Sequence, residues 1–308
     1  MKYTDLDIEE YHKMPGISFS GLSQFDDDCP ARYKAWKDGI TGIDKKAAEL
    51  GNLVHLLVLE PNLFEKKYTV MPEFEKEVRK PDGTKYDSPK NSTAYKNKVK
   101  EFLDENKGKN IIAVSDYDYA NYIAESVRNN RLVTELLLPD GEAEMSYFWE
   151  EAIDIPVDKS RCYHCGGENE IHWMDDITTC IHCQQEYKPN SVLLKTRPDY
   201  VNGNICIDLK TTKSCKYSDF YKAVKYVYNY DAQASLQIQG LTQHGAVIDE
   251  YYWIAVEKER PHIVHVFKAS DEVLTQGKQK IDKWLKKYKW CFDTNNYPGY
   301  ERITVLGE

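Results

Sequence analysis

Two aspartates and one lysine stand at spacings that could bring their side chains to one point. Asp199 precedes the dipeptide Asn202-Gly203, and Asp208-Leu209-Lys210 follows it. An Asn-Gly pair between two segments rich in β-formers predicts a tight hairpin. Residues two apart in a strand share a face, so we expect Asp208 and Lys210 to point the same way, with Asp199 beside them across the turn.

This grouping suits metal-assisted hydrolysis of a phosphodiester. Carboxylates bind Mg²⁺ (or Mn²⁺), which also accepts phosphate oxygens and activates an attacking water. Lys210 would position or deprotonate that water, or neutralise developing charge. If Asp208 and Lys210 stood alone, a salt bridge at a strand edge would be the simpler interpretation. Because Asp199 is expected across the turn, a catalytic site and a structural salt bridge are equally well supported.

Two further residues are candidates for the same site. His55 lies in a helix expected over residues 44–59, one turn after Gly51, whose missing side chain leaves room for a phosphate or a metal. A lone histidine on such a helix is more often structural, which is the alternative here. Glu144, on a strand expected over residues 142–151, is a weaker candidate for a metal ligand or a water-orienting group.

Three polar residues are candidates for contacts with DNA. Gln233 and Gln237 are four apart on a helix expected over residues 231–243 and share a face. Their amides could contact a DNA backbone or brace Lys210, although two exposed glutamines would fit the pattern as well. The net charge of −9 excludes a global basic footprint, so we expect a local positive channel formed by Lys210, Arg197 and the lysines of residues 72–110 or 278–289.

Four cysteines form two pairs with metal-ligand spacing. Such knuckles can place four thiolates tetrahedrally around Zn²⁺, and a closed site of this kind is structural rather than catalytic. An iron–sulfur cluster is the rival interpretation. We therefore predict a Cys₄ zinc ribbon inserted at residues 161–188, with the ligands Cys162, Cys165, Cys180 and Cys183.

Composition limits the class of protein. The chain has 308 residues, of which 41% are hydrophobic and 12% aromatic, which is enough for a packed core. No apolar run approaches the ~18–20 residues of a membrane span, and the first residues carry no secretory signal. We expect a soluble protein of the cytoplasm, with no membrane partner.

The order of predicted elements indicates a mixed α/β layer fold. Helices come first, and three strands follow at residues 142–151, 192–201 and 205–210. Helices are then expected at about 218–228 and 231–243, strands at 251–256 and 263–267, and a last helix at 271–288. Ser270 is the expected N-cap of that helix.

Taken together, the chain resembles the PD-(D/E)XK nuclease superfamily, and more narrowly its RecB-type phage and prophage exonucleases, the RecE or exodeoxyribonuclease VIII-like group. Four segments carry the resemblance, and they are Tyr11-His12-x3-Gly16-Ile17-Ser18 with Ser20 and Cys29-Pro30, Gly51-x3-His55 with Leu59-Glu60-Pro61 and Phe64, Arg197-Pro198-Asp199 with Asp208-Leu209-Lys210-Thr211-Thr212, and Tyr230-x2-Gln233.

The resemblance implies a fold and a set of roles. The fold would be restriction-endonuclease-like, a mixed central sheet flanked by helices, over residues 1–160 and 189–308. Asp199, Asp208, His55 and the carbonyl of Leu209 would bind the metal, and Lys210 would be the catalytic lysine. Gln237 departs from the pattern, because the family has a tyrosine at that position.

The resemblance also implies an activity and partners. It implies Mg²⁺-dependent, 5′-to-3′ digestion of double-stranded DNA ends in phage-type recombination inside a bacterial host cell, beside a single-strand annealing protein, by a ring-shaped homo-oligomer. Two alternatives stay open, namely a structure-specific endonuclease of the same superfamily and a non-catalytic zinc-ribbon protein that binds DNA or a partner.

Overall fold

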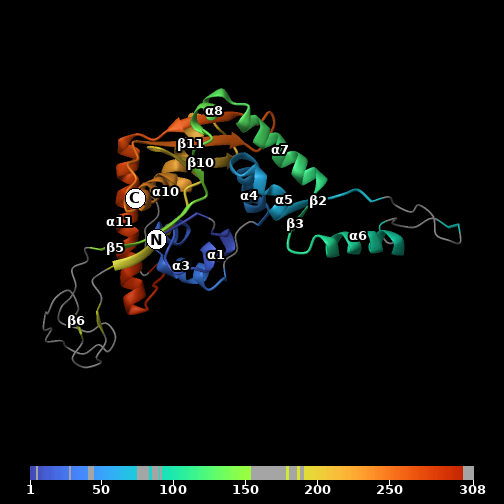
Figure 1. Cartoon of the computed structure of the whole chain (residues 1–308). Helices are drawn as coiled ribbons and strands as arrows, with labels where there is room; N and C mark the ends of the chain where they lie inside the picture. Colours follow the sequence, from blue (N-terminus) through green and yellow to red (C-terminus); the bar gives the residue numbers. More distant parts are fainter. Residues whose placement is uncertain are drawn as a thin grey trace, which may run out of the picture.

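The computed structural model describes residues 1–4, 6–27, 29–40, 45–74, 83–84, 90, 92–153, 178–179, 186–187 and 191–300. Two sheets dominate this part of the chain (Figure 1), and helices lie against both of them. The larger sheet has the order β12-β11-β10-β9-β4 and the smaller one β1-β5-β8. The mixed α/β fold expected from the sequence is confirmed, because β10 runs parallel to β11 and the other pairs in these two sheets are antiparallel.

The strands are β1 (Lys2–Tyr3), β2 (Tyr68–Met71), β3 (Asn110–Ala113), β4 (Glu142–Ala143), β5 (Ser146–Ala152), β6 (Thr178–Thr179), β7 (Glu186–Tyr187), β8 (Ser191–Thr196), β9 (Tyr200–Asn202), β10 (Ile205–Thr212), β11 (Glu250–Glu257) and β12 (Val264–Lys268). The α-helices are α1 (Ile8–Lys13), α2 (Phe19–Leu22), α3 (Pro30–Lys37), α4 (Lys45–Leu59), α5 (Phe64–Lys67), α6 (Thr93–Glu105), α7 (Val114–Arg128), α8 (Arg131–Leu136), α9 (Tyr217–Lys222), α10 (Tyr230–Thr242) and α11 (Asp271–Thr294).

Two of the strands expected to be continuous are broken, and the two breaks lie opposite each other in the paired strands. Residues 142–151 divide into β4 and β5 at Glu144, whose φ is 53°. Residues 192–201 divide into β8 and β9 around Pro198, which has no amide to donate to a ladder. The prediction of two continuous strands was therefore wrong.

The register does not change across the break. Glu142 faces Val201 on one side of it, and Tyr147 faces Thr196 on the other. One antiparallel pair thus passes from the larger sheet to the smaller one and is bent where the ladder is interrupted.

The hairpin predicted next to Asp199 is present. β9 and β10 pair with Asn202 opposite Ile205, so the loop residues are Gly203 and Asn204, one position later than expected. Gly203 has φ 57°, in the left-handed region that glycine adopts without a Cβ penalty. The turn fixes which residues of β10 face Asp199.

Helices cover both faces of the larger sheet. On one face, α4 and α7 pack Val54 and Ile123 against Leu209 and Ile254. On the other, α9 and α10 contribute to a cluster that includes Phe220, Ala234, Cys206 and Trp253. This alternation follows from the strand period of two, because Leu209 points to one helix layer and its neighbours in β10 to the other.

The last helix, α11, runs beside α10 and packs over the smaller sheet (Figure 1), where Trp284 and Ile281 meet Leu194 and Trp149. Gly277 permits the close helix contact, since a Cβ there would lie 2.1 Å from the carbonyl oxygen of Asp231. The hydroxyl of Ser270 accepts from the amide of Val273, so the predicted N-cap is confirmed.

One expected helix needs correction, and the predicted zinc ligands lie outside the described residues. The helix predicted at about 218–228 is α9 followed by a π-helical turn, η4 (Ala223–Val227). The four cysteines of the predicted zinc ribbon lie outside the described residues, although the short strands β6 and β7 on either side of Cys180 and Cys183 pair antiparallel. Within the described ranges, none of the helices is long and apolar enough to cross a bilayer.

Candidate metal centre and active site

The candidate site forms at the bend between the two sheets. The amide of Glu144 donates to the carbonyl of Asp199 across the broken ladder at 3.0 Å, which aligns the two residues. The positive φ of Glu144 turns its side chain out of the regular alternation of the strand. The interruptions that divide the strands therefore also present two carboxylates on one side of the sheet.

His55, Glu144 and Asp199 come together at this bend. One ligand atom from each lies within 4.8 Å of the others. Nδ1 of His55 is 3.5 Å from Oδ2 of Asp199 and 3.9 Å from Oε1 of Glu144. Three residues from three separate segments, which the sequence made candidates for one site, are thus within reach of a single ion.

Arg197 holds Glu144 in place. Its Nε donates to Oε2 of Glu144 at 2.8 Å, and one terminal nitrogen donates to the carbonyl of Leu6 at 2.7 Å and to the hydroxyl of Ser146 at 3.1 Å. The Arg197 side chain is only 10% exposed. In this structure the guanidinium is turned inward and positions a carboxylate, and the DNA contact expected of Arg197 stays a prediction.

Asp208 and Lys210 form a buried ion pair next to this triad. Asp208 is fully buried, and its Oδ2 lies 2.6 Å from Nζ of Lys210. Lys210 also donates to Oε1 of Gln233 at 3.0 Å, while Nε2 of Gln233 donates to Oδ1 of Asp208 at 3.2 Å. Gln233 thus bridges both members of the pair, which matches the bracing alternative from the sequence.

Gln237 does not face solvent. It is 1% exposed, donates to Oδ1 of Asp208 at 3.5 Å and accepts from the hydroxyl of Tyr251 at 2.6 Å. A DNA-backbone contact by Gln237 is therefore excluded in this conformation.

Asp199 also contacts the backbone of β10. Its Oδ2 accepts from the amide of Leu209 at 2.7 Å, while the Leu209 side chain is buried in the core under α4. The hairpin register, continued one step beyond Tyr200 and Ile207, sets Asp199 opposite Asp208. The sequence argument for this juxtaposition is confirmed by the geometry, and metal binding by the Leu209 carbonyl stays a prediction.

The ionisation of the triad is strongly coupled. Burial opposes the charged form of His55, but the nearby carboxylates of Asp199 and Glu144 overcome this and raise the pKa of His55 to about 9. Burial raises the pKa of Asp199 to about 7 against the opposing charge of His55. For Glu144, burial is outweighed by His55 and Arg197, which lower its pKa. Without a metal, the site retains protons that a cation would displace.

Lys210 stays positively charged in this environment. Burial alone would lower its pKa, but the carboxylates of Asp208 and Asp199 raise it above the usual range. A permanently protonated ammonium can neutralise charge and orient a water molecule, whereas it is a poor base at neutral pH. Of the roles considered for Lys210, its raised pKa therefore disfavours deprotonation of the water and leaves charge neutralisation and water positioning.

The donor set fits a hard divalent cation. The carboxylates of Glu144, Asp199 and Asp208 supply oxygen, as Mg²⁺ or Mn²⁺ requires, and His55 adds one nitrogen. Oδ2 of Asp208 is buried and, despite its closeness to Lys210, takes part in no hydrogen bond of normal geometry. A buried carboxylate oxygen with unused acceptor capacity is suited to a metal ligand.

Sequence reasoning missed a second buried lysine near the site. Nζ of Lys195 donates to the carbonyls of Tyr11 and Met14 at 2.8 and 2.7 Å. These contacts hold the segment after α1 against β8, where Ile17 bridges Leu194. The sequence signal for this role is the position of Lys195 directly after Val192-Leu193-Leu194. A charged side chain in an apolar strand is rarely buried without partners, so its ammonium is expected to have some.

The comparisons with known proteins agree with this geometry. The model of a family described as "PDDEXK-like domain of unknown function (DUF3799)" matches residues 18–187 and 185–306. The chain belongs to this family. The superfamily expected from the sequence is thereby confirmed, whereas membership of the narrower RecE-like group stays a prediction.

Two solved structures resemble the chain to different degrees. One is a protein from Eubacterium rectale provisionally classed as an exonuclease, with a TM-score of 0.56, 14% identity, and coverage of 99% of this chain and 95% of that one. At that identity, the likeness shows a shared fold. The other, described as SSO0001, has a TM-score of 0.25 and 13% identity over 60% of this chain and 82% of that one, which is too distant to support an argument. Among curated proteins, no sequence matches this chain.

Proposed function

We propose that this protein is a Mg²⁺- or Mn²⁺-dependent deoxyribonuclease that digests double-stranded DNA from its ends. The observation that carries the proposal is the convergence of His55, Glu144 and Asp199 within 4.8 Å, beside the buried pair of Asp208 and Lys210. Carboxylates around one point, with a protonated lysine next to them, suit phosphodiester hydrolysis. Family membership supports the same chemistry.

Each residue has a proposed part in the reaction. Asp199, Asp208, Glu144 and His55 would hold the ion, which when bound supplies positive charge to the phosphate and to the attacking water. Lys210 neutralises charge on the phosphate, and Gln233 keeps its ammonium in place through a 3.0 Å hydrogen bond. Arg197 fixes Glu144 and so acts as a positioning residue.

The finer parts of the proposal rest on the resemblance. They are 5′-to-3′ polarity, a role in phage-type recombination with a single-strand annealing protein, assembly into a homo-oligomer, and a structural Zn²⁺ bound by the four cysteines. Double-stranded DNA is the proposed substrate, because the narrower group that the sequence resembles digests duplex ends.

The test compares linear with covalently closed circular duplex DNA, each with Mg²⁺ and with chelator. We expect loss of the linear form alone, and only with Mg²⁺. Cutting of the circle would instead indicate the endonuclease alternative. End-labelled substrates then give the polarity of digestion.

A matched pair of variants separates catalysis from binding. Asp208→Asn keeps the shape of the side chain but removes the charge that binds metal, so digestion should fall by at least about 1,000-fold, more than the loss of a single catalytic hydrogen bond, while DNA binding persists. Asp282→Asn, on the exposed surface of α11, should digest DNA at the wild-type rate. A folded wild-type protein that cuts neither DNA under any metal would favour the binding-protein alternative.

A further inference from the structure

An aromatic segment that runs from the end of η4 to the start of α10 is unusually exposed. In the run Tyr226-Val227-Tyr228-Asn229-Tyr230, the first three side chains are 69%, 61% and 57% exposed. Adjacent large apolar side chains that stay in water mark a contact surface more often than a random feature. We call the residues Tyr226–Tyr230 the tyrosine turn.

The tyrosine turn is connected directly to the active site. Nζ of Lys210 lies 4.7 Å from the centre of the Tyr230 ring. The Tyr230 ring in turn stacks on that of Tyr228, with centroids 5.4 Å apart and planes inclined by 21°. Tyr228 is therefore within about 10 Å of the ammonium, a reach of roughly one to three nucleotides, because nucleotides in B-form DNA rise about 3.4 Å each.

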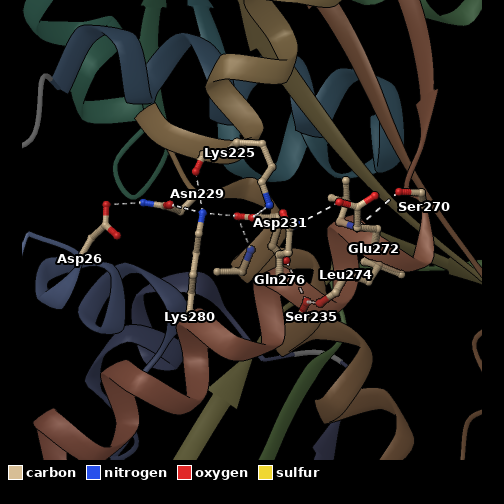
Figure 2. A network of polar contacts seen from close by, with 12 residues as sticks. Asp26, Lys225, Asn229, Asp231, Ser235, Ser270, Glu272, Leu274, Gln276 and Lys280 are labelled. Carbon is tan, nitrogen blue, oxygen red and sulfur yellow. Dashed lines mark hydrogen bonds and ion pairs between the residues drawn. The ribbon is translucent and has the colours of Figure 1, made fainter.

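Lys280 of α11 holds the residues on either side of the exposed rings in place (Figure 2). Lys280 of α11 donates to the carbonyl of Lys225 and to Oδ1 of Asn229, both at 2.6 Å. Nδ2 of Asn229 donates to Asp26 at 2.8 Å, and Asn229 itself adopts φ 53°. Lys280, whose side chain is 23% exposed, therefore contacts the chain on both sides of Tyr226–Tyr228, through the backbone of Lys225 and the side chain of Asn229.

A buried charge cluster supports this lysine. Asp231 is fully buried and receives the ammonium groups of Lys225 at 2.6 Å and of Lys280 at 2.9 Å. Such charges are costly to bury and tolerate little movement, because breaking one contact leaves an unpaired charge. The exposed rings are thus displayed on a rigid base, which lowers the entropy lost when a ligand binds.

The charge around the tyrosine turn favours a nucleic acid as its partner. Between residues 210 and 230 the chain has five lysines and a single acidic residue, Asp219. Three of these lysines, Lys213, Lys216 and Lys222, are exposed on the approach to the turn. Lysines interspersed with exposed aromatic rings are the combination that binds single-stranded nucleic acid, with phosphates on the cations and bases on the rings.

We propose that Tyr228 is a stacking platform for an unpaired nucleobase next to the scissile phosphate. The inference rests on the proposed nuclease function and specifies its substrate, namely a DNA end whose strand carries unpaired bases, in an overhang or a frayed terminus. Tyr230 links the platform to Lys210, so a base seated on Tyr228 places its strand beside the metal centre.

The test uses two probes that differ only in the presence of bases. Each is a duplex with a single-stranded thymidine overhang, and in the second probe every overhang nucleotide is abasic, so the phosphates are the same. Binding is measured by fluorescence anisotropy with Ca²⁺ in place of Mg²⁺, and a gel verifies that the strand stays intact. Wild type, Tyr228→Phe, Tyr228→Ala and Tyr122→Ala are compared. Tyr122 is the control, because it is 49% exposed on α7, over the opposite face of the sheet.

We expect the wild type, Tyr228→Phe and Tyr122→Ala to bind the abasic probe about 5- to 150-fold more weakly, the range for one stacked base. Tyr228→Ala should bind both probes equally, with the salt dependence of the wild type, because its phosphate contacts are unchanged. The stacking role of Tyr228 is refuted, while the nuclease proposal stands, in two cases. In the first, Tyr228→Ala loses as much affinity as the wild type when the thymidine probe is replaced by the abasic probe. In the second, the wild type binds the two probes equally. A wild type that neither binds these probes nor cleaves linear DNA refutes both.

Discussion

The ion pair between Asp208 and Lys210 lends itself to a quantitative test by removing its two charges separately and together. Its atoms are 2.6 Å apart, Asp208 is fully buried and the Lys210 side chain is 14% exposed. At an effective dielectric constant of about 20, two unit charges at that separation attract by about 6 kcal/mol, part of which offsets the cost of desolvation. Asp208→Asn or Lys210→Met leaves one charge unpaired and should each lower the free energy of unfolding by about 3–5 kcal/mol.

The double variant should recover part of this loss. Because neither charge then remains, we expect its cost to fall below the sum of the single costs by about 2–3 kcal/mol. The assay is urea unfolding at pH 8 without added Mg²⁺. The pair Lys278–Asp282, with atoms 3.1 Å apart and side chains 62% and 48% exposed, is the matched control and should show a coupling of about 0.3–0.5 kcal/mol. Equal coupling in both cycles, or strict additivity at Asp208 and Lys210, would refute the reasoning.

Three further predictions concern pH, packing and zinc. The pKa of His55, about 9, and that of Asp199, about 7, lie above their ordinary values of 6.5 and 3.8, so the metal-free folded protein retains extra protons and loses stability as pH rises, by up to about 3 kcal/mol between pH 6.5 and 9.5. Urea unfolding at the two pH values measures this, and saturating Mg²⁺ should reverse the trend, since its ligands bind deprotonated. Gly277→Ala sets a Cβ 2.1 Å from the Asp231 carbonyl oxygen and should lower the free energy of unfolding, measured by thermal unfolding, by about 1–3 kcal/mol. Gly51→Ala should not lower it, because its Cβ only touches the Thr211 hydroxyl at 3.7 Å. Elemental analysis should find one zinc per chain, lost in Cys162→Ser but retained in Cys29→Ser, since Cys29 is buried in the core.

The sequence predicted the elements that local patterns determine. The apolar spacing over residues 44–59 gave α4 and its histidine, and the Asn-Gly signal gave the hairpin that brings Asp199 to β10. The spacing of Gln233 and Gln237 gave their shared face on α10. Each of these depends on residues within one or two turns of one another, where periodicity and turn chemistry are informative.

What the sequence could not predict depends on contacts between distant segments. Nothing local distinguishes Gln233, which reaches Lys210, from Gln237, which is buried against Tyr251. Likewise, Arg197 looks like a phosphate ligand until the carbonyl of Leu6 and the carboxylate of Glu144 are seen to occupy its guanidinium. Asp231 reads as an ordinary acidic residue in the first turn of a helix, and only the fold supplies its two lysines.

The bend in the β4–β5 and β8–β9 pair explains why the candidate metal ligands lie where they do. The register is unchanged across the bend, so Glu144 stands opposite Asp199 as it would in a continuous ladder. In a continuous ladder, however, the side chain of residue 144 would stand perpendicular to the sheet. The left-handed backbone at Glu144 and the missing amide at Pro198 release this constraint, and Arg197 then holds the Glu144 carboxylate near His55. The interrupted hydrogen bonds are thus a local cost in stability that brings the candidate ligands together, a trade expected at functional sites.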